Sequence, residues 1–503
     1  MGVLVTATIV CLGGMILALA GQEPPATNKK SEEPKPGGKS GDSGGAKTAK
    51  SLQELDLPPA LLNELMKGTR SQRTPPDYLT ERRKLPYEKP STADVGKVNS
   101  DEFHKRGTYS ESDRALIERV LKYEVYSLTD SNLHQAEQRK NKDDITRILE
   151  YAQNNSPEFN AIYKQLATQY LRELLTNHLH VRINAMILLA RVRDEQLIND
   201  VYVPLIEDPD EPEAVKYWAV KSIKLLGEHR IKVELESKAV GALLGLLKQN
   251  KPIHFMTRSA VVQALGAVGR ASHIVLQKDA AVAVALLQVV RDPTIRRADR
   301  SEAVTALGNL QIPNDLDYNF QYVAYEIAQF ISDAVAAAID DPAEDNLQTD
   351  MILVRAFWTL IGRAPKDAGT LSERARQHPK RGGDAQYVED LGNRIKDLAK
   401  IALDAYKSDG GGAPQKGKEK KEEDIVARVR TIKDRLRDKD MAKKLRDFNE
   451  YLTSHPPRSM QVTPDVPKLS PPPTLAKPQE PAEQKPPVSK QSSQPAGDQA
   501  GPE

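Results

Sequence analysis

Cysteine is almost absent from this chain of 503 residues, and its one cysteine is Cys11. A single thiol excludes a disulfide framework, a cysteine-ligated zinc site and a Cys-x-x-Cys-His haem attachment. Aromatic residues make up only 5% of the sequence, which is low for a β-rich enzyme core. A charge excess is also missing, since 72 Lys and Arg balance 70 Asp and Glu to a formal net charge of +2. We therefore expect no domain-wide positive field, and this balance by itself argues neither strongly for nor strongly against a nucleic-acid partner.

Catalytic and metal-binding motifs are missing as well. No Ser-x-x-Lys or Gly-x-Ser-x-Gly motif stands in a strand–turn–helix context. His178 and His180 offer two imidazoles, but zinc would need a third ligand such as Asp194 or Glu195, and a polar turn is the simpler interpretation. The sequence therefore predicts a non-enzymatic protein without cofactor or metal. An acidic cluster lacks the ligand spacing and glycine of a calcium loop, and a solvated turn is expected at Glu207, Asp208, Asp210 and Glu211.

An uncharged apolar run, Val3–Gly21, opens the chain. Ala18-Leu19-Ala20 has the small-x-small form of a signal-peptidase site, and the run is also about long enough to span a bilayer. We expect residues 1–21 to be a signal peptide or membrane anchor. The body would then be exported to the cell envelope or periplasm, or secreted. Lys29 and Lys30 leave the cytoplasmic face as the alternative orientation.

Two long segments are poor in apolar residues, one after the apolar run and one at the C-terminal end of the chain. Residues 22–108 are predicted to be a mostly disordered tether with one short helix near 58–67, because they can bury little surface. Residues 456–503 are Pro-rich and are expected to form an extended, disordered tail.

Helical periodicity begins at residue 109. Residues 109–156 are predicted to be an N-terminal helical cap, with Ser110 as an N-cap residue. Residues 364–408 should form a C-terminal capping helix region, and residues 409–455 a linker with charged amphipathic helices. The charged amphipathic stretch fits either two short helices or one stuttered coiled coil. Its last apolar face is Met441, Leu445, Phe448 and Leu452.

An internal repeat occupies the middle of the chain. With Arg182, Lys216, Arg258 and Arg300 as anchors, the same spacing of small and apolar residues recurs four times. Positions +3, +6, +7 and +10 hold Ala185, Leu188, Leu189, Val192; Ala219, Ser222, Ile223, Leu226; Val261, Ala264, Leu265, Val268; and Ala303, Ala306, Leu307, Leu310. A looser fifth copy holds Ala356, Thr359 and Leu360.

A second apolar helix precedes each copy, and prolines fall between the partners. Each unit is therefore a helical hairpin that leaves an apolar face exposed unless it stacks on its neighbours. The predicted fold is all-α, an α-solenoid of stacked helical hairpins. The predicted first helices cover 158–176, 195–206, 237–248, 278–291 and 320–340.

Residues 157–363 resemble the HEAT-repeat family in its bacterial HEAT-like form. The resemblance rests on VRINAMILLARV (181–192), VKYWAVKSIKLLG (215–227), TRSAVVQALGAVG (257–269) and RSEAVTALGNL (300–310). It implies a HEAT/armadillo-like superhelix whose second helices line a groove. The Asp–Arg ladder common in HEAT turns is clear only where Asp210 precedes Lys216, and an insertion displaces the fifth unit.

Gly266 and Gly269 raise the question of a phosphate-binding loop. Such a loop requires a preceding strand and glycines that open a helix, and neither is expected here. Close helix approach at Gly266 and a helix C-terminus at Gly269 are predicted instead.

Aromatic and basic residues on the second helices form the candidate partner-binding surface, because Tyr, Trp and Arg are enriched at interface anchors. The alternative is that both tryptophans pack against neighbouring repeats. The candidate residues are Tyr217, Trp218, Lys221, Lys224, Gln263, Arg355 and Trp358.

We expect an exported or membrane-tethered scaffold or adaptor that binds a protein partner in its groove. One alternative is a HEAT-like lyase or enzyme subunit that handles a small ligand, since some HEAT-like proteins resemble the bilin lyases. Another is a cytoplasmic nucleic-acid-binding solenoid, for which Lys216, Lys221 and Lys224 offer a short basic stripe.

Overall fold

The computed structural model describes residues 82–151, 154–229, 231–248, 253–271, 280–340, 346–362, 369–408, 439–465 and 468–469. All regular secondary structure in these ranges is helical, so the all-α prediction is confirmed for the described residues. An isolated bridge joins Arg270 to Gln311. The predictions for residues 1–21, for the helix near 58–67, for residues 409–438 and for most of the tail lie outside the described residues.

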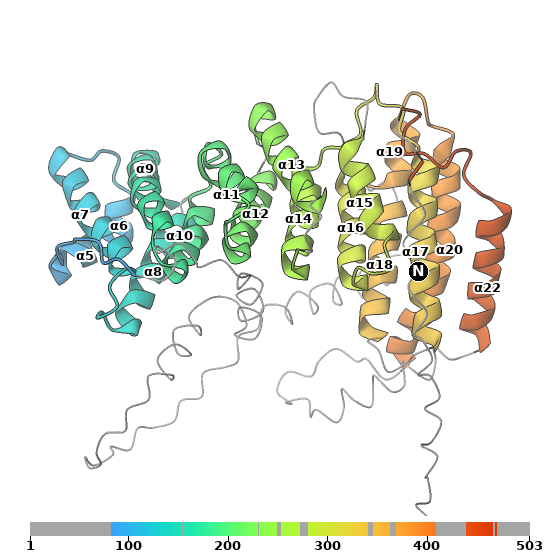
Figure 1. The fold of residues 1–503 in the computed structure, drawn as a ribbon, viewed down its shortest axis with the longest axis horizontal. Coiled ribbons are helices and arrows are strands. Elements are labelled where there is room, and N and C mark those ends of the chain that lie inside the picture. Colours follow the sequence, from blue (N-terminus) through green and yellow to red (C-terminus); the bar gives the residue numbers. More distant parts are fainter. Residues whose placement is uncertain are drawn as a thin grey trace, which may run out of the picture. The chain divides into compact units, whose positions relative to one another are not determined.

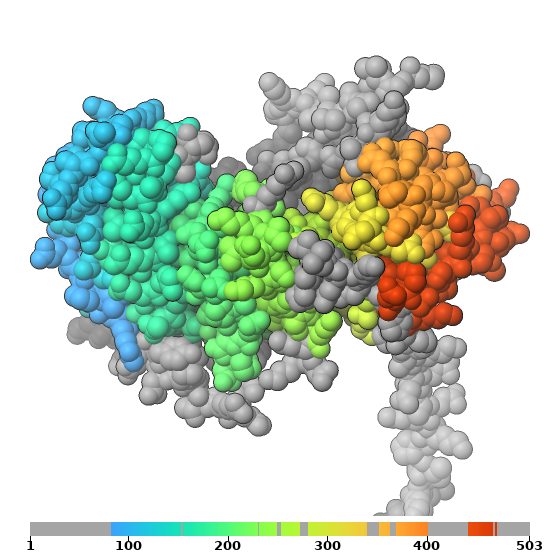
Figure 2. Space-filling view, turned by 90° about the horizontal axis from the view of Figure 1, so that it is seen from above, coloured from blue at the N-terminus to red at the C-terminus, as the bar shows by residue number. Residues whose placement is uncertain are grey.

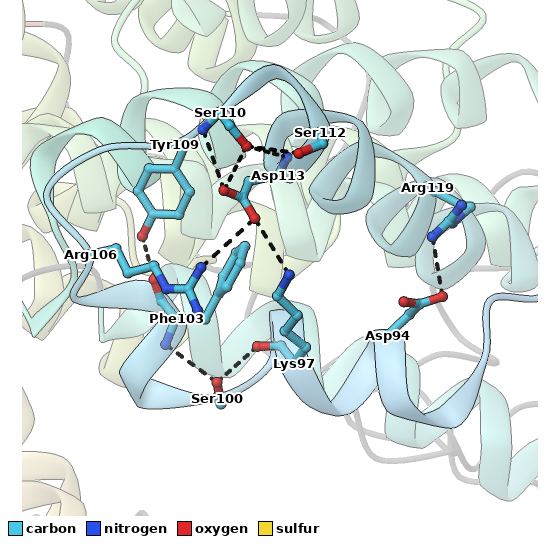
Figure 3. Close-up of polar contacts among 10 residues, drawn as sticks. All are labelled: Asp94, Lys97, Ser100, Phe103, Arg106, Tyr109, Ser110, Ser112, Asp113 and Arg119. Carbon is cyan, nitrogen blue, oxygen red and sulfur yellow. Dashed lines mark hydrogen bonds and ion pairs between the residues drawn. The ribbon is translucent and has the colours of Figure 1, made fainter.

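The N-terminal part contains more structure than the sequence suggested. Residues 82–108 were assigned to the tether, yet they include α5 (Thr92–Val98) and α6 (Asp101–His104) ahead of α7 (Glu111–Ser127) and α8 (Gln135–Glu150). Figure 3 shows the polar contacts that hold this stretch. Asp113 forms a capping box with Ser110, in which its carboxylate accepts from the Ser110 amide, and it also pairs with Lys97. Asp94 pairs with Arg119 at 3.1 Å. These contacts lack helical periodicity, so a periodicity search does not detect them.

An extended segment before α5 is held in the same way. The Leu85 amide donates to the Thr129 hydroxyl at 2.9 Å, and the Tyr87 hydroxyl donates to Asp130 at 2.8 Å. The side chain of Asn177, far along the chain, accepts from the amide of Arg83 at 3.1 Å. Residues 82–91 are therefore attached to the helical part and are not tether.

The central part alternates two rows of helices (Figure 1). The first row is α9 (Pro157–Glu173), a π-helical turn η4 (Ile198–Tyr202) with α11 (Val203–Glu207), α13 (Val233–Lys248), α15 (Ala281–Arg291) and α17 (Phe320–Asp340). The second row is α10 (Leu179–Val192), α12 (Glu213–Gly227), α14 (Phe255–Val268), α16 (Arg297–Asn309) and α18 (Asn346–Ile361). The 3-10 turn η3 (Leu174–Thr176) joins α9 to α10.

Each second-row helix packs against the next one in sequence, from α10 through α12, α14 and α16 to α18. From η4–α11 onward, the first-row helices contact one another in the same order. The small and apolar repeat positions are buried in all four copies except Val268, which is half-buried. The repeat therefore marks the surfaces through which successive helices meet.

The glycines at the second-row helix ends have the predicted roles. A Cβ on Gly266 would lie 2.8 Å from the Cβ of Ala306, so only glycine lets α14 approach α16 this closely. Gly269 ends α14 with φ +77°, the left-handed conformation that glycine adopts without strain. These glycines close a helix and do not open one, so the phosphate-loop alternative fails.

The C-terminal part contains α19 (Leu371–Gln377), α20 (Asp384–Ser408) and α22 (Lys439–Ser454). α20 packs on α18 and α17, and α22 packs on α17 and α20. The predicted apolar face Met441, Leu445, Phe448 and Leu452 is buried there. Among the described helices, α17 is the one long and apolar enough to cross a bilayer, and most of it is buried within the protein.

Candidate functional site

The predicted partner-binding residues on α12 form one aromatic and basic cluster. The rings of Tyr217 and Trp218 meet edge to face with centroids 5.7 Å apart. The Lys221 ammonium lies 4.9 Å from the Trp218 ring centroid and 5.2 Å from that of Tyr217. This is cation–π geometry, which holds the lysine against the aromatic pair.

Tyr217 and Trp218 themselves are 6% exposed. Sequence reasoning placed them off the core face, but α12 is covered by α10 on one flank and by α14 on the other. Both rings therefore pack inside the protein, as the alternative interpretation held for Trp218. Burial also raises the pKa of the Tyr217 hydroxyl, which stays protonated at neutral pH. Lys221 is half-buried, so this cluster presents mainly an ammonium group to solvent.

Two polar contacts link neighbouring second-row helices across this surface. Lys224 of α12 donates to the side-chain oxygen of Gln263 on α14 at 3.1 Å. Arg355 of α18 pairs with Glu302 of α16 at 2.5 Å. All four side chains are half-buried, and so is Trp358, one turn beyond Arg355. The candidate residues thus fall into one group on α12 and α14 and a second on α18, which Arg355 links to α16 through Glu302.

The histidine pair has a structural role. His178 is the N-cap of α10, and its Nδ1 accepts from the amide of His180 at 3.2 Å. Burial, together with the charge of Arg82, lowers the pKa of His180 to about 4. Neither Asp194 nor Glu195 completes a metal site, since no group of three potential ligands gathers among the described residues.

The acidic cluster is also divided between structural roles. Asp208 accepts from the amide of Asp210 at 2.9 Å, which closes a turn. Glu211 instead points inward and pairs with Arg182, and both side chains are almost fully buried. Burial raises the pKa of Glu211, against the lowering effect of Arg182. These carboxylates therefore do not converge on a cation.

Sequence reasoning missed a series of contacts between successive turns. Glu213 of α12 accepts from the amide of His254, the N-cap of α14, at 2.5 Å. The guanidinium of Arg296, before α16, lies 3.5 Å from the ring centroid of Phe255 on α14. The sequence signal was weak, because these partners are chemically different at each turn and do not repeat as one Asp–Arg pair.

The opposite ends of the helices carry a second series. Lys232 pairs with Glu195 at 2.5 Å, and Arg270 pairs with Glu236 at 3.1 Å. The Gln311 amide donates to the carbonyl of Gly269 at 2.5 Å. Successive units are therefore linked at both edges as well as through their apolar faces.

The candidate residues carry ammonium, guanidinium and amide groups, which are able to form ion pairs and hydrogen bonds. The aromatic rings beside Lys221 limit its rotamers.

Comparisons with known proteins add little. No family model matches the sequence, and no curated protein matches it. A crystal structure described as an engineered protein aligns with 14% identity and a TM-score of 0.31, over 72% of this chain and 99% of that one. Values this low define neither a fold family nor a function.

Proposed function

We propose that the chain is an α-solenoid of HEAT-like helix pairs that serves as a scaffold or adaptor for a protein partner. The serial packing of the second-row helices supports this proposal. So do the contacts at both edges, such as Glu213 with His254 and Glu236 with Arg270. A chain of units that contact mainly their neighbours is the defining property of a solenoid.

The partner-binding face is the second row of helices. The observation that carries the proposal is a row of three half-buried side chains, Lys221, Lys224 and Gln263, across α12 and α14. The buried rings of Tyr217 and Trp218 lie beneath this row. Arg355 and Trp358 continue the same row on α18. A preorganised cation over aromatic rings, such as Lys221, favours a partner segment that offers carboxylates or main-chain carbonyls.

The location in the cell follows from the first residues of the sequence. Residues 1–21 act as a signal peptide or membrane anchor, and the helical part lies in the cell envelope or outside the cell. The alternative is an anchored protein whose body faces the cytoplasm.

Site-specific photo-crosslinking in cells tests the face and the compartment together. A crosslinking residue in place of Lys224 should capture one envelope protein from the tagged full-length chain. The same residue in place of Lys248, which is exposed on α13 in the first row, is the matched control. Lys221→Glu should abolish capture from position 224. Equal capture from 224 and 248 would contradict the face, and captured cytoplasmic proteins or nucleic acid would contradict the compartment.

A further inference from the structure

The last described residues of the chain form an arm that folds back on α17. This C-terminal arm comprises α22 and residues 455–465. Figures 1 and 2 show it beside α17 and α20, in red against yellow and orange. The arm is joined to α17 across more than 100 positions of sequence, for example where the Ser332 hydroxyl contacts the side chain of Asn449.

Asn319, immediately before α17, holds the end of the arm. Its side-chain amide donates to the carbonyl of Ser459 at 2.9 Å and to that of Gln461 at 3.0 Å. Its main-chain amide donates to the carbonyl of Val462 at 2.8 Å. Its side-chain oxygen accepts from the Tyr322 amide at 3.0 Å and so caps α17. One buried residue therefore begins the helix and binds the arm at the same time.

Gln321 adds a fourth contact of the same kind. Its side-chain oxygen accepts from the main-chain amide of Arg458 at 3.3 Å, and its nitrogen donates to Asp384 at 3.0 Å. The contacts of Asn319 and Gln321 reach only main-chain atoms of the arm. They therefore bind the main chain of the arm whatever its side chains, as main-chain hydrogen bonds do in one of the common modes of peptide recognition.

Two neighbouring side chains supply the selectivity. Val462 is fully buried and Thr463 nearly so, whereas Met460 is 39% exposed. Pro456 and Pro457 follow α22 and prevent the helix from continuing into the bound segment. The arm thus presents a bent main chain with two β-branched anchors.

We propose that the start of α17, formed by Asn319 and Gln321, is a peptide-binding site, and that residues 458–463 occupy it as a tethered ligand that a free peptide can displace. The peptide that fits is a bent segment with β-branched residues at the Val462 and Thr463 positions and any residue at the Met460 position. This site lies on the first row of helices and does not depend on the proposed partner-binding face.

Occupancy by a tethered ligand makes a specific prediction for affinity. The tether keeps the arm at an effective concentration on the order of millimolar, so a free peptide must compete with it. A full-length chain whose own arm cannot dock should therefore bind a free arm peptide more tightly than the wild type does.

The probe is a fluorescent peptide that spans residues 439–465, and the readout is its anisotropy. The arm-release chain carries Phe448→Asp and Val462→Asp, which place charges at two buried arm positions. We expect this chain to bind the probe at least about tenfold more tightly than the wild type does. Equal affinities for the two chains would overturn the proposal.

Asn319→Asp tests the site itself. Aspartate keeps the oxygen that caps α17 but loses the side-chain donor to Ser459 and Gln461. In the arm-release chain it should weaken probe binding about tenfold, because two hydrogen bonds to the probe are lost. Unchanged binding would overturn the role of Asn319. A probe with Met460→Ala is the control and should bind as the unmodified probe does.

Hydrogen exchange of the otherwise wild-type chain covers the case in which the arm-release chain does not fold. The main-chain amides of Asn319 and Arg458, which donate to the Val462 carbonyl and to the Gln321 side chain, should be protected, and Asn319→Asp should weaken this protection while α10 to α16 stay protected. Absence of protection in the wild type would overturn the proposal. A dimer that Asn319→Asp dissociates would place the arm on a second copy and overturn the assignment within one chain.

Discussion

Gly266 of α14 lies directly against Ala306 of α16, at a point where a Cβ on Gly266 would come within 2.8 Å of the Ala306 Cβ and 2.9 Å of its Cα. The second contact involves main chain, so the two helices would have to move apart to admit a methyl group. This contact sets the spacing between two successive units of the repeat.

Gly266→Ala should therefore destabilise the protein by about 1–3 kcal/mol, the usual cost of overpacking. The matched control is Gly245→Ala in α13, where a Cβ meets nothing within 4 Å. Alanine should stabilise that helix by up to about 1 kcal/mol. Urea unfolding of the two variants measures both effects, and stabilisation by Gly266→Ala would contradict the close contact.

Arg182 and Glu211 should stabilise the fold only when both residues are present. Both side chains are almost fully buried, so Glu211→Gln leaves a buried guanidinium without its counter-charge. We expect a loss of about 3–5 kcal/mol, and we expect Arg182→Met with Glu211→Leu to recover most of it. The exposed pair of Arg114 with Glu158 is the control, and its disruption should cost less than about 1 kcal/mol. Similar losses at the two pairs in denaturant titrations would be inconsistent with the buried geometry.

His180 should make stability fall in mild acid. Its pKa is about 4 in the folded chain, mainly through burial, against an ordinary value of 6.5. A depressed pKa means that the unfolded chain binds the proton first, so this contribution is complete above pH 6.5 and is lost as the pH falls towards 4. Its size is up to about 3 kcal/mol.

His180→Leu should remove that contribution. The free energy of unfolding of the variant, relative to the wild type, should rise by this amount between pH 8 and pH 4. For each chain, the free energy of unfolding at pH 8 serves as the reference. A constant difference across the range would show that His180 does not titrate in this way.

Glu124 should change the stability of the protein with pH in the direction opposite to that of His180. It is fully buried in α7 and accepts from the Asn99 side chain at 3.0 Å, and burial raises its pKa to about 8. A raised pKa means that its contribution is complete below pH 4.5 and is lost as the pH rises through 8.

Glu124→Gln keeps the acceptor for Asn99 without the titration. Relative to the wild type, this variant should gain stability between pH 5 and pH 9, by a few kcal/mol at most because ionisation can be relieved by local opening. A gain towards low pH instead would contradict the sign of the shift.

The repeated part of the chain was predictable from sequence because helical periodicity is a local property. The predicted first helix over 320–340 is α17 with the same bounds, and repeat positions such as Ala185, Ile223 and Leu307 are fully buried. Ser110 and Gly269 mark helix ends as expected, since capping depends on a few neighbouring residues. For the candidate surface, the sequence predicted only which positions on the second helices belong to it. It did not predict that Tyr217 and Trp218 are buried.

The order of residues was therefore enough to indicate which residues form helices and which side of each helix is apolar. The tertiary structure alone decided which neighbour covers each flank: it buries Tyr217 and Trp218 between α10 and α14, attaches residues 82–91 to Thr129 and Asp130, and places the C-terminal arm on Asn319. The physical reason is that periodicity describes a helix relative to its own axis. Contacts between residues far apart in sequence depend on the path of the chain, and single hydrogen bonds to main-chain atoms have no periodic pattern.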